Sequence, residues 1–374
     1  MSVQGPSIAA AASLPLGLST TADLPDDALW DCFVGETAGG DILQTTAWAE
    51  TKRALGFDVG RLVLRREGRV AGGSHIVVKR LGLLGGIGYI ARGPILGDGQ
   101  ADQAESLMDQ IHGWCRANRV RHLIVQAGEH AEAIGQALMG RDYIGNAPAV
   151  APTATLRIDL RQSVDQILGG MSAARRRDLR LAERSGVTTR IGGDADLDVF
   201  CAMHEATAHR QDFAPLSRSY LRQQWSVLHP LGWLQLFIAH HEGKPIAGIT
   251  VTAFGDRVTF RVAGWTGEAA NLRSNAACHW SAIQWARRQG YRYYDFGDFD
   301  RKAAEALIAA PDAAGQHAQS PEAFKHRFGG ELVLLPEPRQ FTFNPVARAV
   351  TRAAFGRLAG RSSFRRFIHR FRNG

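Results

Sequence analysis

The chain lacks several features that would assign it to common protein classes. It has few cysteines, with no C-x-x-C spacing and no disulfide framework: Cys32, Cys115, Cys201 and Cys278. No run reaches the roughly 18 uninterrupted apolar residues of a membrane span. It contains no G-x-S-x-G motif, no H-E-x-x-H motif and no other zinc-ligand spacing. We therefore expect reduced thiols, no bound metal and a protein of the cytoplasm.

Acidic residues are missing from the end of the chain. From Arg339 onward there are nine arginines and no aspartate or glutamate, so the net charge of +8 resides in this tail. Phenylalanines recur there at helical spacing, and arginines fill the other faces: Arg361, Arg365, Arg366 and Arg370. Such a basic amphipathic helix suits an anionic membrane surface, tRNA or a cyclic dinucleotide. The alternative is a helix that packs its phenylalanines on the body of the protein.

The chain does contain an internal repeat. Residues 67–78 read EGRVAGGSHIVV and residues 242–253 read EGKPIAGITVTA, about 175 residues later. This period is far longer than the 20 to 50 residues of a solenoid unit. The repeat therefore predicts one domain that has been duplicated.

Each copy has the pattern of a mixed α/β sheet. In the first, 61–81 alternates around Glu67-Gly68 as a hairpin, 86–96 is a further strand, 101–119 has helical spacing, and 122–127 is a short buried strand. The second copy repeats this order. Helices precede both hairpins, over 43–55 and over 163–186, where Ser163 and Gln166 fit a capping box.

These patterns divide the chain into four segments. Residues 1–25 are expected to be a disordered leader, and 26–150 to be the first domain. Residues 151–340 are expected to be the second domain, and 341–374 the basic helical tail. The predicted fold class is α/β, with two tandem mixed-sheet domains followed by that helix.

The order of elements and three motifs resemble a known family. LQTTAWAETKRALGF, SAARRRDLRLAERSGV and, most specifically, PEAFKHRFGGEL are similar to the FemABX-like branch of the GNAT acyltransferase superfamily. The resemblance covers about residues 40–340. It implies transfer of an acyl or aminoacyl group to an amine of a cell-envelope precursor. In the family the donor is either an aminoacyl-tRNA or, in exopolysaccharide-linked relatives, acyl-CoA, and no cofactor is tightly bound.

The resemblance implies one catalytic residue, and the end of a strand offers two further candidates. Lys325 of the F-K element would stabilise the tetrahedral intermediate at the acceptor site, with Phe324 beside it; the alternative is a surface lysine. At the end of the last strand of the second copy, Asp295 is a candidate to accept the proton of the amine, and Tyr294 to donate to the leaving group. Aspartate and glycine at the end of a strand are also ordinary turn residues.

Two further groups are candidates for binding the acceptor. Trp48 and Lys52 share a helix face, and the family resemblance implies a phosphate contact for Lys52; the alternative is a solvated lysine. Arg176 and Arg180 share a face of a later helix and would suit phosphate or carboxylate, although a charge run is often a solvated face. A shared acceptor would lie in a cleft between the two copies.

The donor site is the least certain match. A GNAT protein cradles the CoA pyrophosphate with R/Q-x-x-G-x-G/A at a helix N-terminus. Here the matching stretch contains no glycine, which leaves Arg273, Asn275 and Ala276 as the candidate residues. In the first copy, Gly97-Asp98-Gly99 is a weaker match, as expected of a copy that has lost its donor site.

The sequence thus predicts an N-acyltransferase that uses acyl-CoA to modify an amine on a lipid- or nucleotide-linked glycan or peptide. It would work at the inner face of the membrane in envelope or exopolysaccharide assembly. The first alternative is an aminoacyl-tRNA-dependent enzyme that builds peptidoglycan bridges. The second is a binding protein, without catalysis, that responds to a membrane or a nucleotide.

Overall fold

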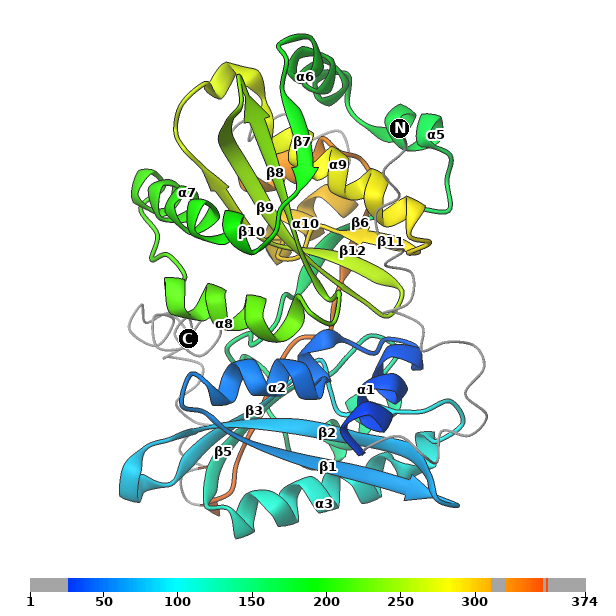
Figure 1. Ribbon diagram of the computed structural model, residues 1–374. Coiled ribbons are helices and arrows are strands. Elements are labelled where there is room, and N and C mark those ends of the chain that lie inside the picture. The colour runs from blue at the N-terminus through cyan, green and yellow to red at the C-terminus, as the bar shows by residue number, and fades with distance from the viewer. Residues whose placement is uncertain (1–25, 311–319, 346–347, 349–374) are drawn as a thin grey trace. The chain divides into compact units, whose positions relative to one another are not determined.

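The computed structural model describes residues 26–310, 320–345 and 348, which form two compact units. The first unit takes in 26–153 and the described residues from 335 onward, and the second takes in 154–334. Each unit has a mixed α/β sheet, as the duplicated pattern predicts (Figure 1). The leader and the basic tail lie outside the described residues.

The first unit is built on the strand order β1-β2-β3-β5-β13, with β4 paired to β2. Its elements, in chain order, are α1 (Asp26–Glu36), η3 (Ile42–Gln44), α2 (Thr46–Arg53), β1 (Asp58–Arg66), β2 (Arg69–Arg80), η4 (Gly82–Leu84), β3 (Gly86–Ala91), β4 (Ile95–Leu96), η5 (Ala101–Gln103), α3 (Ala104–Ala117), β5 (Val120–Gln126), α4 (Glu132–Gly140) and β13 (Arg339–Thr342). Helix α3 covers one face of the sheet, and α1 and α2 cover the other (Figure 1).

The second unit has the strand order β12-β6-β11-β10-β9-β8-β7. Its elements are β6 (Ala154–Asp159), α5 (Val164–Gly170), α6 (Ala173–Arg184), β7 (Thr188–Ile191), η6 (Asp194–Asp196), α7 (Leu197–Arg210), α8 (Arg218–Leu228), β8 (Leu234–His241), β9 (Lys244–Phe254), β10 (Arg257–Trp265), η7 (Ala270–Leu272), α9 (Ser274–Arg288), β11 (Tyr293–Asp295), α10 (Arg301–Ala309), α11 (Pro321–His326) and β12 (Glu331–Leu334). Helix α7 packs on β9 and β10, whereas α9 packs on β8 and β9 and against α6.

The repeated sequence has a clear structural cause. Glu67-Gly68 and Glu242-Gly243 form the tight turns of the two hairpins, where both residues of each turn have positive φ. Six residues after each glutamate a glycine follows, and its missing side chain leaves room for an aromatic ring to pack on the strand. A Cβ on Gly73 would lie 2.7 Å from the Trp30 ring of α1, and one on Gly248 would lie 3.1 Å from the Phe200 ring of α7. Each hairpin therefore keeps the turn and the helix contact of the duplicated unit.

The capping-box prediction is confirmed, but the single helix over 163–186 is not. Ser163 and Gln166 form the expected capping box, and Thr45 caps α2. Met171 is extended, and Ser172 starts a new helix by accepting a hydrogen bond from the Arg175 backbone. The chain therefore forms α5 and α6, because the new N-cap competes successfully with helix continuation.

One expected strand and the end of the second domain also differ in the structure. The strand over 86–96 is divided into β3 and β4, because Pro94 between them has no N–H to donate. The second unit ends at Leu334 rather than at residue 340. Beyond it, β13 pairs antiparallel with β5 and returns to the sheet of the first unit. In that sheet it takes the place that β6 has beside β11 in the second unit.

Candidate functional site

The F-K-x-x-F-G-G element lies on the short helix α11 and the turn that follows it. Ser320 caps this helix by accepting a hydrogen bond from the Ala323 backbone, and Pro321 occupies the first turn, where its missing N–H costs nothing. Phe328 is 1% exposed and belongs to the core of the second unit, with Phe324 packed beside it. The two aromatic side chains anchor the segment, as expected.

Arg175 of α6 holds this segment from the inside. Its side chain is 2% exposed, and its guanidinium lies 4.3 Å and 4.2 Å from the ring centres of Phe324 and Phe328. One guanidinium nitrogen donates to the Phe324 carbonyl over 2.7 Å, and another lies 3.3 Å from the Asp178 carboxylate. Burial lowers the pKa of Arg175 to about 10, so the group remains a cation at neutral pH.

The two glycines of the element allow close approach of other backbone segments. Gly329 and Gly330 have φ of +74° and +98°. A Cβ on Gly329 would lie 2.3 Å from the Gly170 carbonyl oxygen, and one on Gly330 would lie 2.2 Å from that of Arg157. Larger residues therefore do not fit at either position. These contacts join the segment to α5 and β6.

Lys325 is placed against the end of β11. Its ammonium donates to the carbonyl oxygen of Asp298, in the turn that follows this strand. The side chain is half-buried rather than fully solvated. The structure thus brings together two predicted features, the F-K lysine and the strand end that contains Asp295.

Asp295 itself is 4% exposed and heavily hydrogen-bonded. Its carboxylate accepts from the Thr155 hydroxyl, from Arg157 Nε at 2.8 Å and from the Gly297 backbone at 2.7 Å. These contacts fasten β11 to β6 and close the turn. They occupy the lone pairs that a general base would use, so the proton-accepting role of Asp295 stays a prediction.

Tyr294 is completely buried beside a histidine that the sequence analysis did not select. Its hydroxyl lies 2.8 Å from His279 Nδ1, and burial raises the pKa of Tyr294 well above 10. Burial and the nearby cations of Arg175 and Lys325 lower the pKa of His279 well below 6.5. The pair is therefore neutral at neutral pH, and the role of Tyr294 as a donor to the leaving group stays a prediction.

The importance of Arg175 and His279 was missed, although both left a signal in the sequence. Arg175, Leu179 and Ala182 follow i, i+4 and i+7 spacing, which is typical of a core-facing stripe. Ala182 is 2% exposed, and Leu179 packs on the core. His279 lies four residues after Asn275, on the same face of α9 as one of the predicted donor residues.

Arg176 and Arg180 line one pocket of about 410 Å³ between α6, β7 and α9. Trp280 and Ala277 of α9 form the opposite wall. Arg176 also caps α5, since its guanidinium donates to the carbonyl oxygens of Leu168, Gly169 and Met171. Arg180 is exposed. The predicted pair therefore shares a pocket, with one arginine engaged by the backbone.

The predicted donor residues lie at the first turn of α9. Arg273 has a left-handed backbone (φ +58°), and its Nε lies 3.2 Å from Asp178, the same carboxylate that Arg175 contacts. The Ala276 N–H donates to the Arg273 carbonyl over 3.0 Å. The Oδ1 atom of Asn275 is buried and has no hydrogen-bond partner within the part of the chain that the structure describes. These three residues thus share one helix end, at which a positive dipole favours anions.

Lys52 and Trp48 lie in the first unit. Lys52 is 2% exposed, which is unlike a solvated helix lysine, and Nζ lies 5.7 Å from the centre of the Trp48 ring. Trp48 is 4% exposed, and its backbone donates to the Thr45 hydroxyl. The structure therefore brings these two predicted residues together. Because they and Lys325 belong to different units, a shared acceptor stays a prediction.

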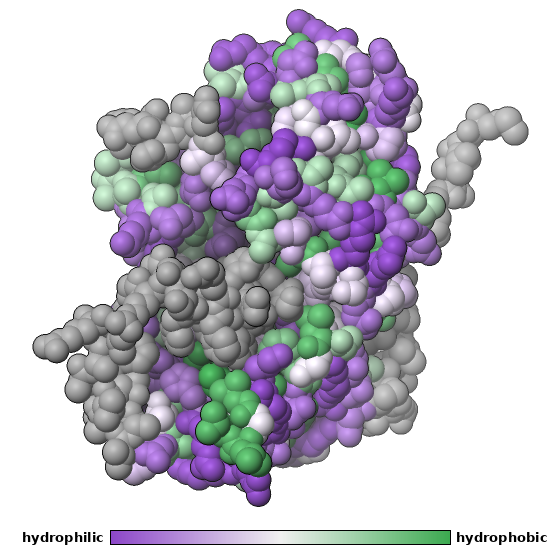
Figure 2. Space-filling model, turned by 90° about the vertical axis from the view of Figure 1, so that its left-hand side faces the viewer, coloured by the Kyte–Doolittle hydropathy of each residue, from purple (hydrophilic) through white to green (hydrophobic). Residues whose placement is uncertain are grey.

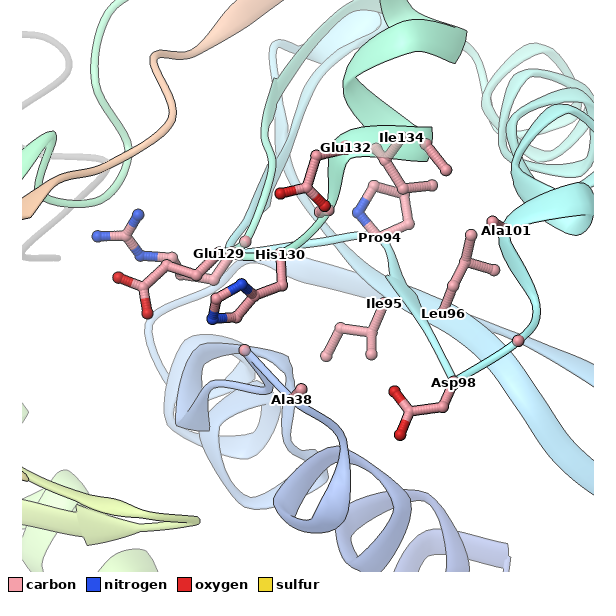
Figure 3. A pocket seen from close by; sticks show the side chains of 17 residues that line it. Ala38, Pro94, Ile95, Leu96, Asp98, Ala101, Glu129, His130, Glu132 and Ile134 are labelled. Carbon is pink, nitrogen blue, oxygen red and sulfur yellow. The ribbon is translucent and has the colours of Figure 1, made fainter. Parts of the chain in front are cut away.

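The first unit has a pocket of about 270 Å³ where β3 and β5 end. Three carboxylates, those of Asp98, Glu129 and Glu132, surround its apolar wall at Pro94 and Ile95 (Figure 3). Arg92 and His130 also line the pocket, but three carboxylates against one guanidinium leave it acidic, which disfavours the pyrophosphate of CoA. That agrees with the weak Gly97-Asp98-Gly99 match and leaves α9 as the candidate donor end.

Metal binding and membrane crossing were also considered for the described residues. Within 26–310, 320–345 and 348, no group of three or more His, Cys, Asp or Glu side chains is arranged to hold a metal ion. No helix in the same residues is long and apolar enough to cross a membrane. The predicted tail residues Arg361, Arg365, Arg366 and Arg370 lie outside the described part of the chain.

Comparison with known proteins finds relatives in both sequence and fold. Residues 171–306 match the Acetyltransferase (GNAT) domain family. The chain is 24% identical over 225 residues to the Lipid II:glycine glycyltransferase of Staphylococcus aureus (strain MRSA252), which covers 57% of this chain and 53% of the relative. The chain thus spans about half the length of the curated relatives it matches.

Two solved structures share its fold. The crystal structure of FemX has a TM-score of 0.76 and 19% identity, covering 87% of this chain and 98% of that chain. The structure of L-PGS from Bacillus licheniformis has a TM-score of 0.50 and 14% identity, covering 90% and 98%. At these identities the structural likeness shows the fold alone. The two sequence matches are to an acetyltransferase domain and to a glycyltransferase.

Proposed function

We propose that this chain, a member of the FemABX-like branch of the GNAT superfamily, transfers an aminoacyl group to an amine of a peptidoglycan precursor. The observation that carries the proposal is the placement of Lys325. A buried arginine, two phenylalanines and two glycines hold the segment that presents this lysine at the end of β11. A cation held in this way is preorganised to stabilise negative charge that develops during acyl transfer.

The reaction requires no nucleophilic side chain. The lone pair of the acceptor amine attacks the carbonyl carbon of the aminoacyl ester, so that an N–C bond forms and the carbonyl oxygen becomes an oxyanion. The ester C–O bond then breaks, and the ribose oxygen of the tRNA leaves with a proton that the amine has lost. Lys325 is our candidate for stabilising the oxyanion.

Acceptor binding is assigned to cations beside apolar or aromatic side chains. Lys52, buried against Trp48, is the candidate for a phosphate of a lipid- or nucleotide-linked acceptor. Phe324 would form one wall of the acceptor site next to Lys325. The pocket of Arg176 and Arg180, with Trp280 opposite, would take a further anionic part of a substrate.

The donor assignment follows the sequence relatives. The matched relative is a Lipid II:glycine glycyltransferase, and the stretch before α9 lacks the glycines with which GNAT proteins cradle CoA pyrophosphate. A side chain, that of Arg273, occupies the left-handed position at the helix start. An aminoacyl ester of tRNA is therefore the preferred donor. The same Lys325 chemistry would serve a thioester.

Acyl-CoA is the second candidate donor, with an amino sugar of an exopolysaccharide precursor as acceptor. The match of residues 171–306 to an acetyltransferase domain favours it. So does the helix end at Arg273, Asn275 and Ala276, where the helix dipole attracts phosphate. This candidate differs from the first in both its donor and its acceptor.

The test supplies each donor separately to the purified full-length chain. A lipid-linked or nucleotide-linked peptidoglycan precursor is incubated with charged tRNA, acetyl-CoA or succinyl-CoA, and the mass of the precursor is followed. We expect an aminoacyl mass increase with charged tRNA. Transfer should weaken steeply as salt rises, because tRNA binding depends on phosphate contacts.

Lys325→Ala supplies the variant and Lys302→Ala the matched control. Lys302 is an exposed lysine of α10 in the same unit. Product formation should be lost with Lys325→Ala and kept with Lys302→Ala. An acetyl mass increase with acetyl-CoA alone would replace the first donor by the second. The absence of product with every donor would overturn the assignment of a peptidoglycan precursor as the acceptor.

A further inference from the structure

The turn between β2 and β3 exposes three leucines that nothing in the proposed reaction uses. Leu83 is 104% exposed, Leu84 is 77% exposed, and Leu81 is 37% exposed. They surround the 3-10 turn η4 in the sequence LGLLGG (81–86). Exposed leucines so close together are unfavourable in water and mark a surface that contacts another apolar phase.

The leucines project because the turn is well formed. The Leu81 N–H donates to the Gly85 carbonyl over 2.8 Å, and the Leu84 N–H donates to the Leu81 carbonyl over 3.2 Å. Gly82 and Gly85 have φ of +59° and +91°, which a turn this tight requires. The paired strands β2 and β3 hold both ends of the turn. The apolar tip is therefore presented by an ordered hairpin.

Basic side chains surround the base of this tip. Arg121 packs against Gly85, where an added Cβ would lie 2.8 Å from its Cγ atom, and the Gly86 N–H donates to the Arg119 carbonyl over 3.0 Å. Arg119 and Arg121 are exposed. Arg80, just before the turn, pairs with Asp58 over 2.5 Å. Since Asp58 is engaged by Arg80, the two other arginines leave this end of the sheet net positive.

The surface view agrees with this arrangement. Figure 2 turns the left-hand side of Figure 1 toward the reader, including the end of the first sheet at which β2 passes into β3. A compact hydrophobic patch, in green, lies there next to hydrophilic residues in purple.

We propose that the turn 81–85 docks the first unit on a lipid bilayer that carries anionic headgroups. Leu83 and Leu84 would enter the boundary between headgroups and acyl chains, while Arg119 and Arg121 contact lipid phosphates. A protruding apolar tip with a basic rim fits this partner, because a bilayer surface offers an apolar interior beneath negative charge. The inference is independent of the proposed transfer activity and places a membrane contact outside the basic tail.

The test measures co-sedimentation of the full-length chain with vesicles. Vesicles of phosphatidylcholine with a quarter phosphatidylglycerol are compared with vesicles of phosphatidylcholine alone. We expect the wild type to prefer the anionic vesicles, and the double variant Leu83→Ser, Leu84→Ser to bind about tenfold more weakly, since each leucine lost reduces the apolar area inserted. Arg119→Gln, Arg121→Gln should reduce the preference for anionic lipid.

The control carries serines at two exposed apolar positions elsewhere, Met139 and Leu231. Its binding should equal that of the wild type. Unchanged binding of the leucine variant would overturn the proposal. A wild-type chain that binds neither kind of vesicle would also overturn it, and the leucines would then be expected to contact another protein. No substrate is present, so these results are separate from the outcome of the transfer assay.

A fluorescent probe tests whether the tip enters the bilayer. Leu83→Cys in a Cys32→Ser background places a reactive thiol at the tip, because Cys115, Cys201 and Cys278 are buried. An environment-sensitive dye at position 83 should shift to shorter wavelength on anionic vesicles. A dye at position 139 of a matched Met139→Cys chain should not. An unshifted dye at position 83 on bound protein would overturn the proposal.

Discussion

The guanidinium of Arg175 donates to the Phe324 carbonyl over 2.7 Å and also lies 4.3 Å from the centre of the Phe324 ring. A single buried cation thereby positions the backbone and the side chain of the residue that precedes Lys325. The centre of the Phe328 ring lies 4.2 Å from the same guanidinium, so the cation contacts both aromatic rings of the element it holds. The position of the proposed catalytic lysine therefore depends on a residue of another helix.

Replacing Arg175 by alanine should destabilise the second unit. The change leaves a cavity beside the two rings and a buried Phe324 carbonyl without its donor, at a cost of about 3 kcal/mol in the free energy of unfolding. Denaturant titration measures this cost. Arg177→Ala, an exposed position of the same helix, is the control and should change stability by less than about 0.5 kcal/mol. Equal stability of the two variants would contradict the assigned role of Arg175.

Replacing Lys325 by alanine should affect the reaction and leave the fold intact. Loss of one preorganised charge at a developing oxyanion lowers turnover by about 100-fold or more. The lysine is half-buried at the surface of α11, so the free energy of unfolding should stay close to that of the wild type. Turnover and KM are measured for Lys325→Ala and Lys302→Ala. A rise in KM with unchanged turnover would assign Lys325 to ground-state binding instead.

The two glycines of the F-K-x-x-F-G-G element offer a test by addition of a methyl group. Gly330→Ala should destabilise the second unit by about 2 kcal/mol or more, because the backbone has φ +98° and the Cβ would meet the Arg157 carbonyl at 2.2 Å. Gly169→Ala is the control, since no atom lies within 4 Å of its added Cβ in α5. That control should be neutral or slightly stabilising, as alanine favours helices. Two equally stable variants would contradict the close approach.

The hairpins and helix caps could be predicted because their signals are local. Glu-Gly between alternating segments specifies a tight turn, and Ser163 with Gln166 specifies a helix start. The break between α5 and α6 was missed because the second N-cap, Ser172, lies inside a helical pattern. The pairing of β13 with β5 could not be predicted, because it joins residues more than 200 positions apart. Neither strand has a local sequence signal that specifies the strand with which it pairs.

The site shows the same limit. The F-K element identified Lys325 and its aromatic neighbours, because these residues are adjacent in the sequence. Four arginines lie close together on α6, and the pair chosen for its shared face, Arg176 and Arg180, lines a pocket. The core-facing spacing of Arg175 with Leu179 and Ala182 was the one local sign of its burial, and its packing against Phe324 and Phe328 is seen only in the structure. Residues that act through contacts between distant helices need the structure.

His75 predicts a dependence of stability on pH in the first unit. Its ring is 3% exposed, and Nδ1 lies 3.1 Å from the Thr45 carbonyl, so Nδ1 carries the proton and donates. Burial and the nearby Arg61 lower the pKa of His75 to about 3. Below about pH 6.5 the unfolded chain therefore binds a proton that the folded chain does not bind. Stability is retained above that pH and is lost as pH falls, by up to about 1.4 kcal/mol per pH unit.

The variant His75→Asn isolates this contribution, because an amide can still donate to Thr45 but does not titrate. Denaturation midpoints at pH 7, 6 and 5 should fall less steeply for His75→Asn than for the wild type. The difference in slope is the quantity to compare, since burial raises the pKa of Asp31 to about 6 and so acts in the opposite direction over the same range. The exposed His130→Asn is the control and should keep the wild-type slope. A slope for His75→Asn as steep as that of the control would show that His75 does not remain neutral in the folded state.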